Sequence, residues 1–172
     1  MKSESPEVGR PWSMTALILL SFYVGIETLL SNALAMVSIL SEKDPRVLQE
    51  IRSASPFSSE MEMLLITYCL VVGVLLVVFT YLLMIREQDI YRRLIKGILA
   101  VDVFAFLGQI SYFYHVGFQH PNAQLYYSAV FLTLLEVFLI IGLSHPGIIR
   151  YCQSRNHPPS QDPQNQMNQG RR

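Results

Sequence analysis

The chain has 172 residues, of which 51% are hydrophobic and 15% are charged, and its 13 basic and 13 acidic side chains leave no net charge. Soluble domains are usually about a quarter charged, so this composition favours a membrane protein over a water-soluble domain. The neutral balance gives no electrostatic basis for binding nucleic acid. Two cysteines are too few for a disulfide framework.

Four apolar stretches follow one another along the chain. They run over about residues 14–40, 63–85, 97–118 and 125–143. A helix rises about 1.5 Å per residue, so about 20 residues cross a hydrocarbon core of about 30 Å. Because only helices and closed barrels satisfy their backbone in lipid, we expect an all-α, polytopic bundle of four transmembrane helices over residues 14–145.

The segments on either side of these stretches are polar. Residues 1–13 form a short N-terminal segment. Residues 146–172 are expected to be a disordered tail, because from Gln153 onward they are rich in Gln, Asn, Pro and Ser and have no apolar periodicity.

Local signals predict where helices begin. Ser59 and Glu62 have the spacing of a capping box, which would start the second transmembrane helix. Asp44 and Pro45 suit the N-cap and first position of a short helix through Ile51, lying at the membrane interface.

Basic residues are distributed unequally over the two sides of the predicted bundle. One side holds ten of them: Lys2, Arg10, Arg86, Arg92, Arg93, Lys96, Arg150, Arg155, Arg171 and Arg172. The other side holds three: Lys43, Arg46 and Arg52. Cytosolic loops carry an excess of Lys and Arg, so we expect both termini in the cytosol. The endoplasmic reticulum membrane is the location that we assume for the function hypothesis below.

A cleaved signal peptide is a competing interpretation of the first apolar stretch. Ala33 and Ala35 have the small-residue spacing of a cleavage site. Removing this helix would leave the other three oriented as before, so the charge distribution does not decide the matter. Glu27 argues against cleavage, because a discarded segment has no use for a costly buried acid.

Three carboxylic acids lie inside the apolar stretches: Glu27, Asp102 and Glu136. An acid in the middle of a membrane costs about 2.5–3.5 kcal/mol, and such residues usually face the interior of the bundle. By helical rise, all three lie in the middle or the cytosolic half of the membrane. A shared pocket would explain this agreement in depth.

Polar and aromatic side chains accompany the acids on the same helix faces. Four of them lie at helical spacing from an acid and are the expected substrate-binding residues: Tyr23, Phe106, Gln109 and Thr133. No metal is expected, since His115 has no second His or Cys at ligand spacing. No phosphate-binding or dinucleotide motif occurs either, so no cofactor is expected.

Three interpretations of the buried acids remain open. In the first, one protonated acid acts as a general acid on an alkene or epoxide, a second carboxylate and aromatic rings stabilise the carbocation, and another group removes a proton. In the second, the acids only join helices through hydrogen bonds, with Glu27 on Ser31 and Glu136 on Thr133, in a scaffold or lipid-binding module. The third is proton-coupled transport.

Two runs of residues resemble known membrane proteins. Phe22-Tyr23-x-x-x-Glu27, and Ile90-Tyr91-Arg92-Arg93 through Gly97 to Asp102, resemble an uncharacterised family of small fungal four-helix membrane proteins. The four-span layout is also similar to the emopamil-binding-protein and sigma-2-receptor superfamily, whose members bind sterol-like ligands between helices and include a sterol isomerase with intramembrane acids. This resemblance implies an isomerase or cyclase acting on a terpenoid or sterol-like substrate within the membrane, in fungal secondary metabolism.

Overall fold

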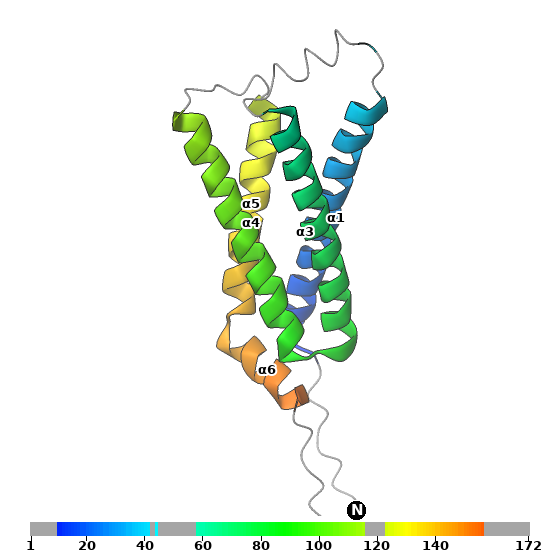
Figure 1. The fold of residues 1–172 in the computed structure, drawn as a ribbon. Coiled ribbons are helices and arrows are strands. Elements are labelled where there is room, and N and C mark those ends of the chain that lie inside the picture. Colours follow the sequence, from blue (N-terminus) through cyan, green and yellow to red (C-terminus); the bar gives the residue numbers. More distant parts are fainter. Residues whose placement is uncertain (1–9, 42–43, 45–57, 116–122, 157–172) are drawn as a thin grey trace, which may run out of the picture.

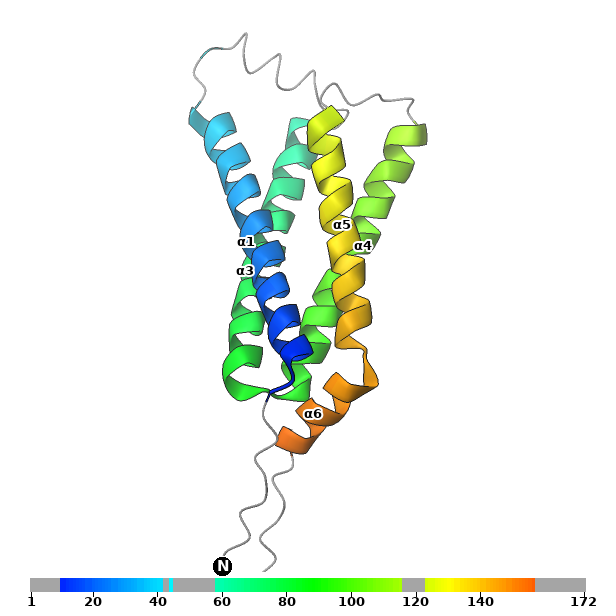
Figure 2. The same ribbon diagram turned by 180° about the vertical axis from the view of Figure 1, so that it is seen from behind.

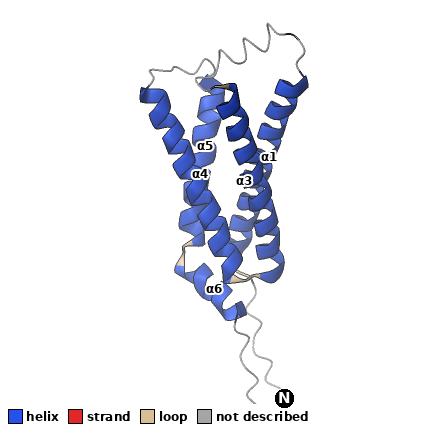
Figure 3. Ribbon diagram, in the orientation of Figure 1, coloured by secondary structure: helices blue, strands red, loops and turns tan. Residues whose placement is uncertain are grey.

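The structure is a computed structural model that describes residues 10–41, 44, 58–115 and 123–156 (Figure 1). These residues form five helices and no strand (Figure 3). The helices are α1 (Trp12–Ser41), α3 (Ser59–Arg86), α4 (Asp89–His115), α5 (Ala123–Leu143) and α6 (Pro146–Asn156). The predicted all-α class is confirmed.

The lengths and composition of the helices suit a protein that crosses a membrane several times. Three helices, α1, α3 and α4, are long and apolar enough to span one. Helix α5 meets the same criterion together with α6, although the two are bent by 62° at the break between them. By length and composition, the described residues therefore offer three candidate spans, or four if the bent pair counts as one.

The four long helices form a ring in the order α1, α3, α4 and α5, each packing on its two neighbours (Figures 1 and 2). Helix α6 closes one end of the ring, which we call the α6 end. The opposite end, where α1 and α4 finish, is called the far end. Helices α1 and α4 lean apart toward the far end in both views.

Two glycines bring α1 and α3 close together. A Cβ atom added to Gly73 would lie 3.0 Å from the backbone nitrogen of Leu29, and one added to Gly25 would lie 3.1 Å from the Cβ of Leu76. Both distances are shorter than ordinary contacts between side chains. Small residues at such crossings are how helices in membranes gain packing energy without a hydrophobic driving force.

The apolar core lies in the half of the bundle next to α6. Its fully buried members come from every helix: Met14 and Ile18 of α1, Leu76 and Leu83 of α3, Ile95 and Leu99 of α4, Leu139 and Leu143 of α5, and Ile148 and Cys152 of α6. Much of the outer surface of the long helices is also apolar, as expected of helices that face lipid. The far half has few buried residues, which leaves room inside the ring.

A buried ion pair begins α4. Arg92 donates from Nε to Asp89 Oδ1 at 2.7 Å and from Nη1 to the carbonyl oxygen of Leu143 at 2.7 Å. The other Asp89 oxygen accepts a hydrogen bond from Arg93 Nε at 2.6 Å. Asp89 and Arg92 are both buried, so they bind the start of α4 to the end of α5 through charge-assisted hydrogen bonds.

Glu87 is the centre of a second polar group, the Glu87 cluster, formed with Arg10, Tyr151 and Arg155. Its carboxylate accepts hydrogen bonds from Arg10 Nε at 2.7 Å and from the Tyr151 hydroxyl at 2.6 Å, and Arg155 Nε lies 3.1 Å away. Burial by itself would raise the pKa of Glu87, but the hydrogen bonds and the two arginines outweigh it and hold the pKa below its ordinary value. The cluster joins Arg10, two residues before α1, to the α3–α4 turn and α6.

Two helix starts differ from the predictions. Helix α3 has Ser58 as its N-cap, with the hydroxyl accepting from the Met61 backbone nitrogen at 3.3 Å, so the capping box predicted at Ser59 is wrong by one position. Helix α4 begins at Asp89 and not near residue 97. The apolar stretch predicts only the part of the helix that lipid can surround. The ion pairs of Asp89 with Arg92 and Arg93 stabilise two further polar turns of the helix before it.

The tail also differs from its prediction. Residues 146–156 form α6 and are not disordered. Ile148, Tyr151 and Cys152 recur at helical spacing and bury one face of α6 against the bundle. The remainder of the tail, the interfacial helix predicted over 45–51 and the link between the third and fourth helices lie outside the described residues.

Candidate functional site

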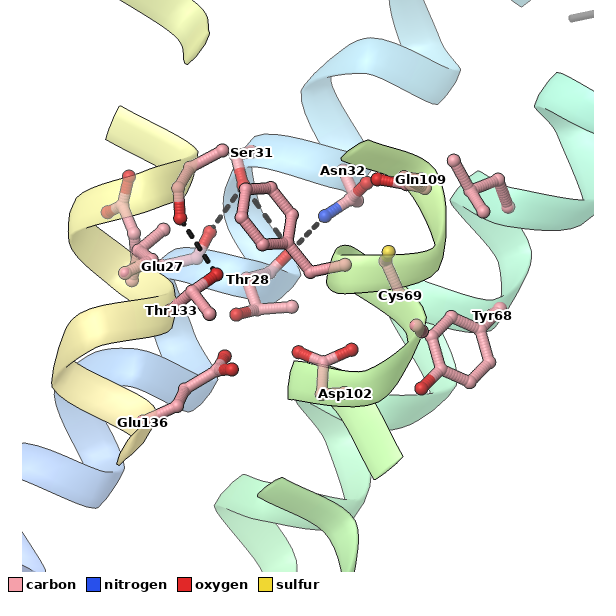
Figure 4. Close-up of a pocket in the computed structure, with 15 residues that line it drawn as sticks. Glu27, Thr28, Ser31, Asn32, Tyr68, Cys69, Asp102, Gln109, Thr133 and Glu136 are labelled. Carbon is pink, nitrogen blue, oxygen red and sulfur yellow. Dashed lines mark hydrogen bonds between the residues drawn. The ribbon is translucent and has the colours of Figure 1, made fainter. Parts of the chain in front are cut away.

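A cavity of about 290 Å³ lies inside the ring, between the apolar core and the far end. All four long helices contribute to its wall (Figure 4). The lining residues are Glu27, Thr28, Ser31 and Asn32 of α1; Leu65, Tyr68 and Cys69 of α3; Asp102, Ala105, Phe106 and Gln109 of α4; and Ala129, Leu132, Thr133 and Glu136 of α5. Polar groups are therefore gathered in a part of the bundle that is otherwise apolar.

Six of the seven residues predicted from the sequence line this cavity. They are the three acids, Glu27, Asp102 and Glu136, with Phe106, Gln109 and Thr133. Tyr23 is the exception: it does not line the cavity, and 51% of its surface is exposed. Thr28 marks the buried face of α1, and at 100° per residue Tyr23 is turned away from it by about 140°.

Asp102 and Glu136 form a carboxyl pair. Their side chains extend from α4 and α5 toward one another across the cavity (Figure 4), close enough to interact directly. Glu136 is 3% exposed. Two carboxylates in an apolar site repel each other, so the arrangement favours a pair that shares one proton.

The hydroxyl groups next to the acids donate hydrogen bonds within their own helices. Ser31 Oγ donates to the backbone oxygen of Glu27 at 2.7 Å, and Thr133 Oγ1 donates to that of Ala129 at 3.0 Å. These are the hydroxyls that a purely structural role would use to hold the carboxyl groups of Glu27 and Glu136. Since their protons are given to the backbone, they do not donate to the acids.

The sequence interpretation missed the contribution of α3. Tyr68 and Cys69 line the cavity, and within the described residues the Tyr68 hydroxyl is buried with no partner at hydrogen-bonding distance. It nevertheless lies near enough to Asp102 for the two groups to interact. A tyrosine inside an uncharged span was the available signal, because a buried phenol usually needs a polar partner.

The donor set of the cavity suits proton transfer better than metal binding. Among the residues described, no group of three or more His, Cys, Asp or Glu side chains could hold a metal ion. Carboxyl, phenol and amide groups converge on one apolar space, and this is a set that can give, accept or relay protons. No protein-family model, curated protein or solved structure matches this chain.

Proposed function

We propose that this protein is a membrane-embedded isomerase or cyclase that acts on a terpenoid or sterol-like substrate by acid–base chemistry through a carbocation. The observation that carries the proposal is the Asp102–Glu136 pair, whose side chains face one another across a cavity between apolar helices. A carboxylic acid that keeps its proton in an apolar site can act as a general acid, as buried acids do in other enzymes.

The proposed reaction moves one proton onto the substrate and removes another. The protonated carboxyl of the pair gives its proton to an alkene carbon, whose π electrons form the new C–H bond and leave a carbocation at the neighbouring carbon. The carboxylate left behind and the face of Phe106 stabilise this cation. A carboxylate then takes a proton from an adjacent carbon, and the electrons of that C–H bond form the new alkene. The third acid, Glu27, is available for this last step.

The surroundings of the cavity support a substrate that arrives from the lipid. Leu65 and Gln109 also line a groove near the far end of α3 and α4, together with Met61, Gly108 and Tyr112. Leu65 and Gln109 therefore separate the cavity from this outer groove. The volume of about 290 Å³ is at the lower limit of ligand pockets, which hold about 300–1,000 Å³.

The orientation and location belong to the same proposal. The excess of basic residues supports a cytosolic α6 end, with both termini in the cytosol, and we propose the endoplasmic reticulum as the membrane. The layout that resembles the emopamil-binding-protein superfamily supports the substrate class, since that superfamily holds sterol-like ligands between its helices.

Amide variants of the three acids test the proposal. Glu27→Gln, Asp102→Asn and Glu136→Gln keep the size of each side chain and remove its titratable proton. Membranes carrying each variant are compared for protein level and for conversion of candidate terpenoid and sterol substrates. Asp102→Asn, Glu136→Gln or both should lower the conversion of the substrate by about a hundredfold or more, the usual scale of general acid–base catalysis.

The matched control is Glu60→Gln, which changes an exposed acid in the first turn of α3 that does not line the cavity. It should keep full activity. Full activity in all three cavity variants, in a preparation where the wild type converts a substrate, would end the carbocation hypothesis.

A second candidate is a non-catalytic lipid-binding protein. The buried Tyr68 hydroxyl, which has no partner within the described structure, favours it, because such a group is ready to bond to the hydroxyl of a sterol-like ligand. Tyr68→Phe should then weaken ligand binding, while the amide variants of the acids should leave the bound ligand chemically unchanged and its affinity intact.

A further inference from the structure

A second hollow lies on the outer surface of the bundle, along the seam between α3 and α4. It has a volume of about 360 Å³ and is lined by Tyr68, Val71, Val72 and Leu75 of α3 and by Arg93, Leu94, Gly97, Ile98 and Val101 of α4. We call it the seam groove. Apart from Arg93 and the ring of Tyr68, its walls are aliphatic side chains and a glycine.

Gly97 keeps the seam groove open. A Cβ atom added there would meet nothing within 4 Å, unlike the glycines that bring α1 and α3 together. Arg93, Gly97 and Val101 follow one another at four-residue spacing, so they lie along one face of α4. The groove therefore runs for about 12 Å along the helix, from a cation at the α6 end toward the middle of the bundle.

The cation at this end carries charge that its own neighbours do not neutralise. Asp89 gives one carboxylate oxygen to Arg92 and the other to Arg93. One negative charge thus faces two positive ones. Arg92 is buried and also holds the Leu143 carbonyl, whereas the Arg93 side chain is 68% exposed. The excess positive charge is consequently available at the mouth of the groove.

We propose that the seam groove binds an anionic phospholipid, with one acyl chain lying over Gly97 and the phosphate at Arg93. The charge and the apolar walls match the two halves of such a lipid. The guanidinium group of Arg93 can bind a phosphate through paired N–H donors. An acyl chain that fills the groove gains van der Waals contacts with its aliphatic walls, which an empty groove would lose. The methyl end of the acyl chain reaches Tyr68, which also lines the cavity. A lipid bound here therefore contacts the outer side of the cavity wall.

Native mass spectrometry of the detergent-purified full chain tests this site. Phosphatidylglycerol and phosphatidylcholine with identical acyl chains are added in turn. The wild type should bind phosphatidylglycerol about fivefold more tightly, the factor that one basic residue contributes at a membrane surface. Arg93→Gln should remove this preference, while Arg86→Gln, which changes an exposed arginine outside the groove, should keep it.

A second variant tests binding of the acyl chain, whereas Arg93→Gln tests binding of the phosphate. Gly97→Leu fills the groove and should weaken binding of both lipids, while Ala16→Leu on the exposed face of α1 should change neither. Inorganic phosphate alone should not displace the lipid. Equal binding of both lipids by the wild type, an unchanged preference in Arg93→Gln, or displacement by inorganic phosphate would each overturn the proposal. None of these outcomes depends on whether the protein is an enzyme.

Discussion

Arg10 donates a hydrogen bond of 2.7 Å to the carboxylate of Glu87, 77 positions further along the chain. Glu87 lies in the left-handed region with φ of 52°, a conformation that non-glycine residues seldom adopt because of their Cβ. The backbone strain is offset by the three partners that its side chain reaches. The turn between α3 and α4 therefore depends on residues from both ends of the described chain.

This dependence predicts how stability varies with pH. Since the pKa of Glu87 is lowered in the folded protein, its stabilising contribution is fully present above its ordinary value of 4.5 and is lost as the pH falls through the lower, folded value. The thermal midpoint of the detergent-purified protein should fall over this acidic range. Glu87→Gln should lack that part of the fall, and Glu60→Gln should keep it. Identical acid profiles for the wild type and Glu87→Gln would contradict the prediction.

The buried ion pair at the start of α4 predicts a large loss of stability. Asp89→Asn leaves the Arg92 guanidinium buried without its counter-charge, which should cost about 3–5 kcal/mol. Arg93→Gln breaks an ion pair with the same aspartate, but on an exposed side chain, and should cost about 0–1 kcal/mol. Denaturation of both variants in the same detergent measures the difference. Equal losses would show that burial does not set the strength of these pairs.

The crossing of α1 and α3 predicts opposite effects at two glycines. Gly73→Ala would put a methyl group 3.0–3.1 Å from backbone and Cβ atoms of Leu29, forcing the helices apart and lowering the thermal midpoint. Gly108→Ala meets nothing within 4 Å, so it should gain up to about 1 kcal/mol from better helix propensity. A neutral Gly73→Ala would mean that the two helices are not closely packed in the membrane.

The bundle geometry and the charge distribution together predict a topology. Reporters at the C-terminus and in the α3–α4 turn should lie on one side of the membrane, and a reporter at Asp44 should lie on the other. The charge distribution further predicts that the shared side is the cytosol. Accessibility of the reporters to a membrane-impermeant reagent, before and after permeabilisation, measures both. A luminal C-terminus would contradict the charge argument alone, whereas a C-terminus and turn on opposite sides would contradict the bundle.

The helices were predictable because lipid imposes a simple demand on sequence. A stretch such as 63–85 has to be uncharged and mostly apolar, and this can be recognised without knowing its neighbours. The site was predictable in part for a related reason: an acid such as Asp102 is too costly in lipid to be placed there without an inward-facing position. The prediction that Tyr23 lines the site is not met, because residues at four-residue spacing shift by about 40° around the helix at each step, and this shift turns Tyr23 out of the cavity-facing side of α1.

Features that depend on distant partners could not be predicted in this way. The partners of Glu87 are Tyr151 and Arg155 of α6 and Arg10, two residues before α1. No local sequence pattern indicates that pairing. Helix α6 was missed for a similar reason, since Pro146 and the polar residues of the tail resemble the end of a domain. The three apolar residues of its buried face stabilise a helix only when they pack against the end of the bundle, and the sequence of the tail alone does not show that contact.

The position of the cavity beyond the ion pairs of the α6 end has a mechanical consequence. The ion pairs and most of the buried core hold the helices together at the α6 end, and the cavity lies beyond them. Glu27 is about 22 Å along α1 from Trp12, so a tilt of α1 by about 5° about that anchored end would displace Glu27 by about 2 Å. Because Gly25 and Gly73 hold α1 closely against α3, such a tilt would carry the two helices together, and it would widen the cavity between them and the α4–α5 pair while leaving the polar contacts at the α6 end in place.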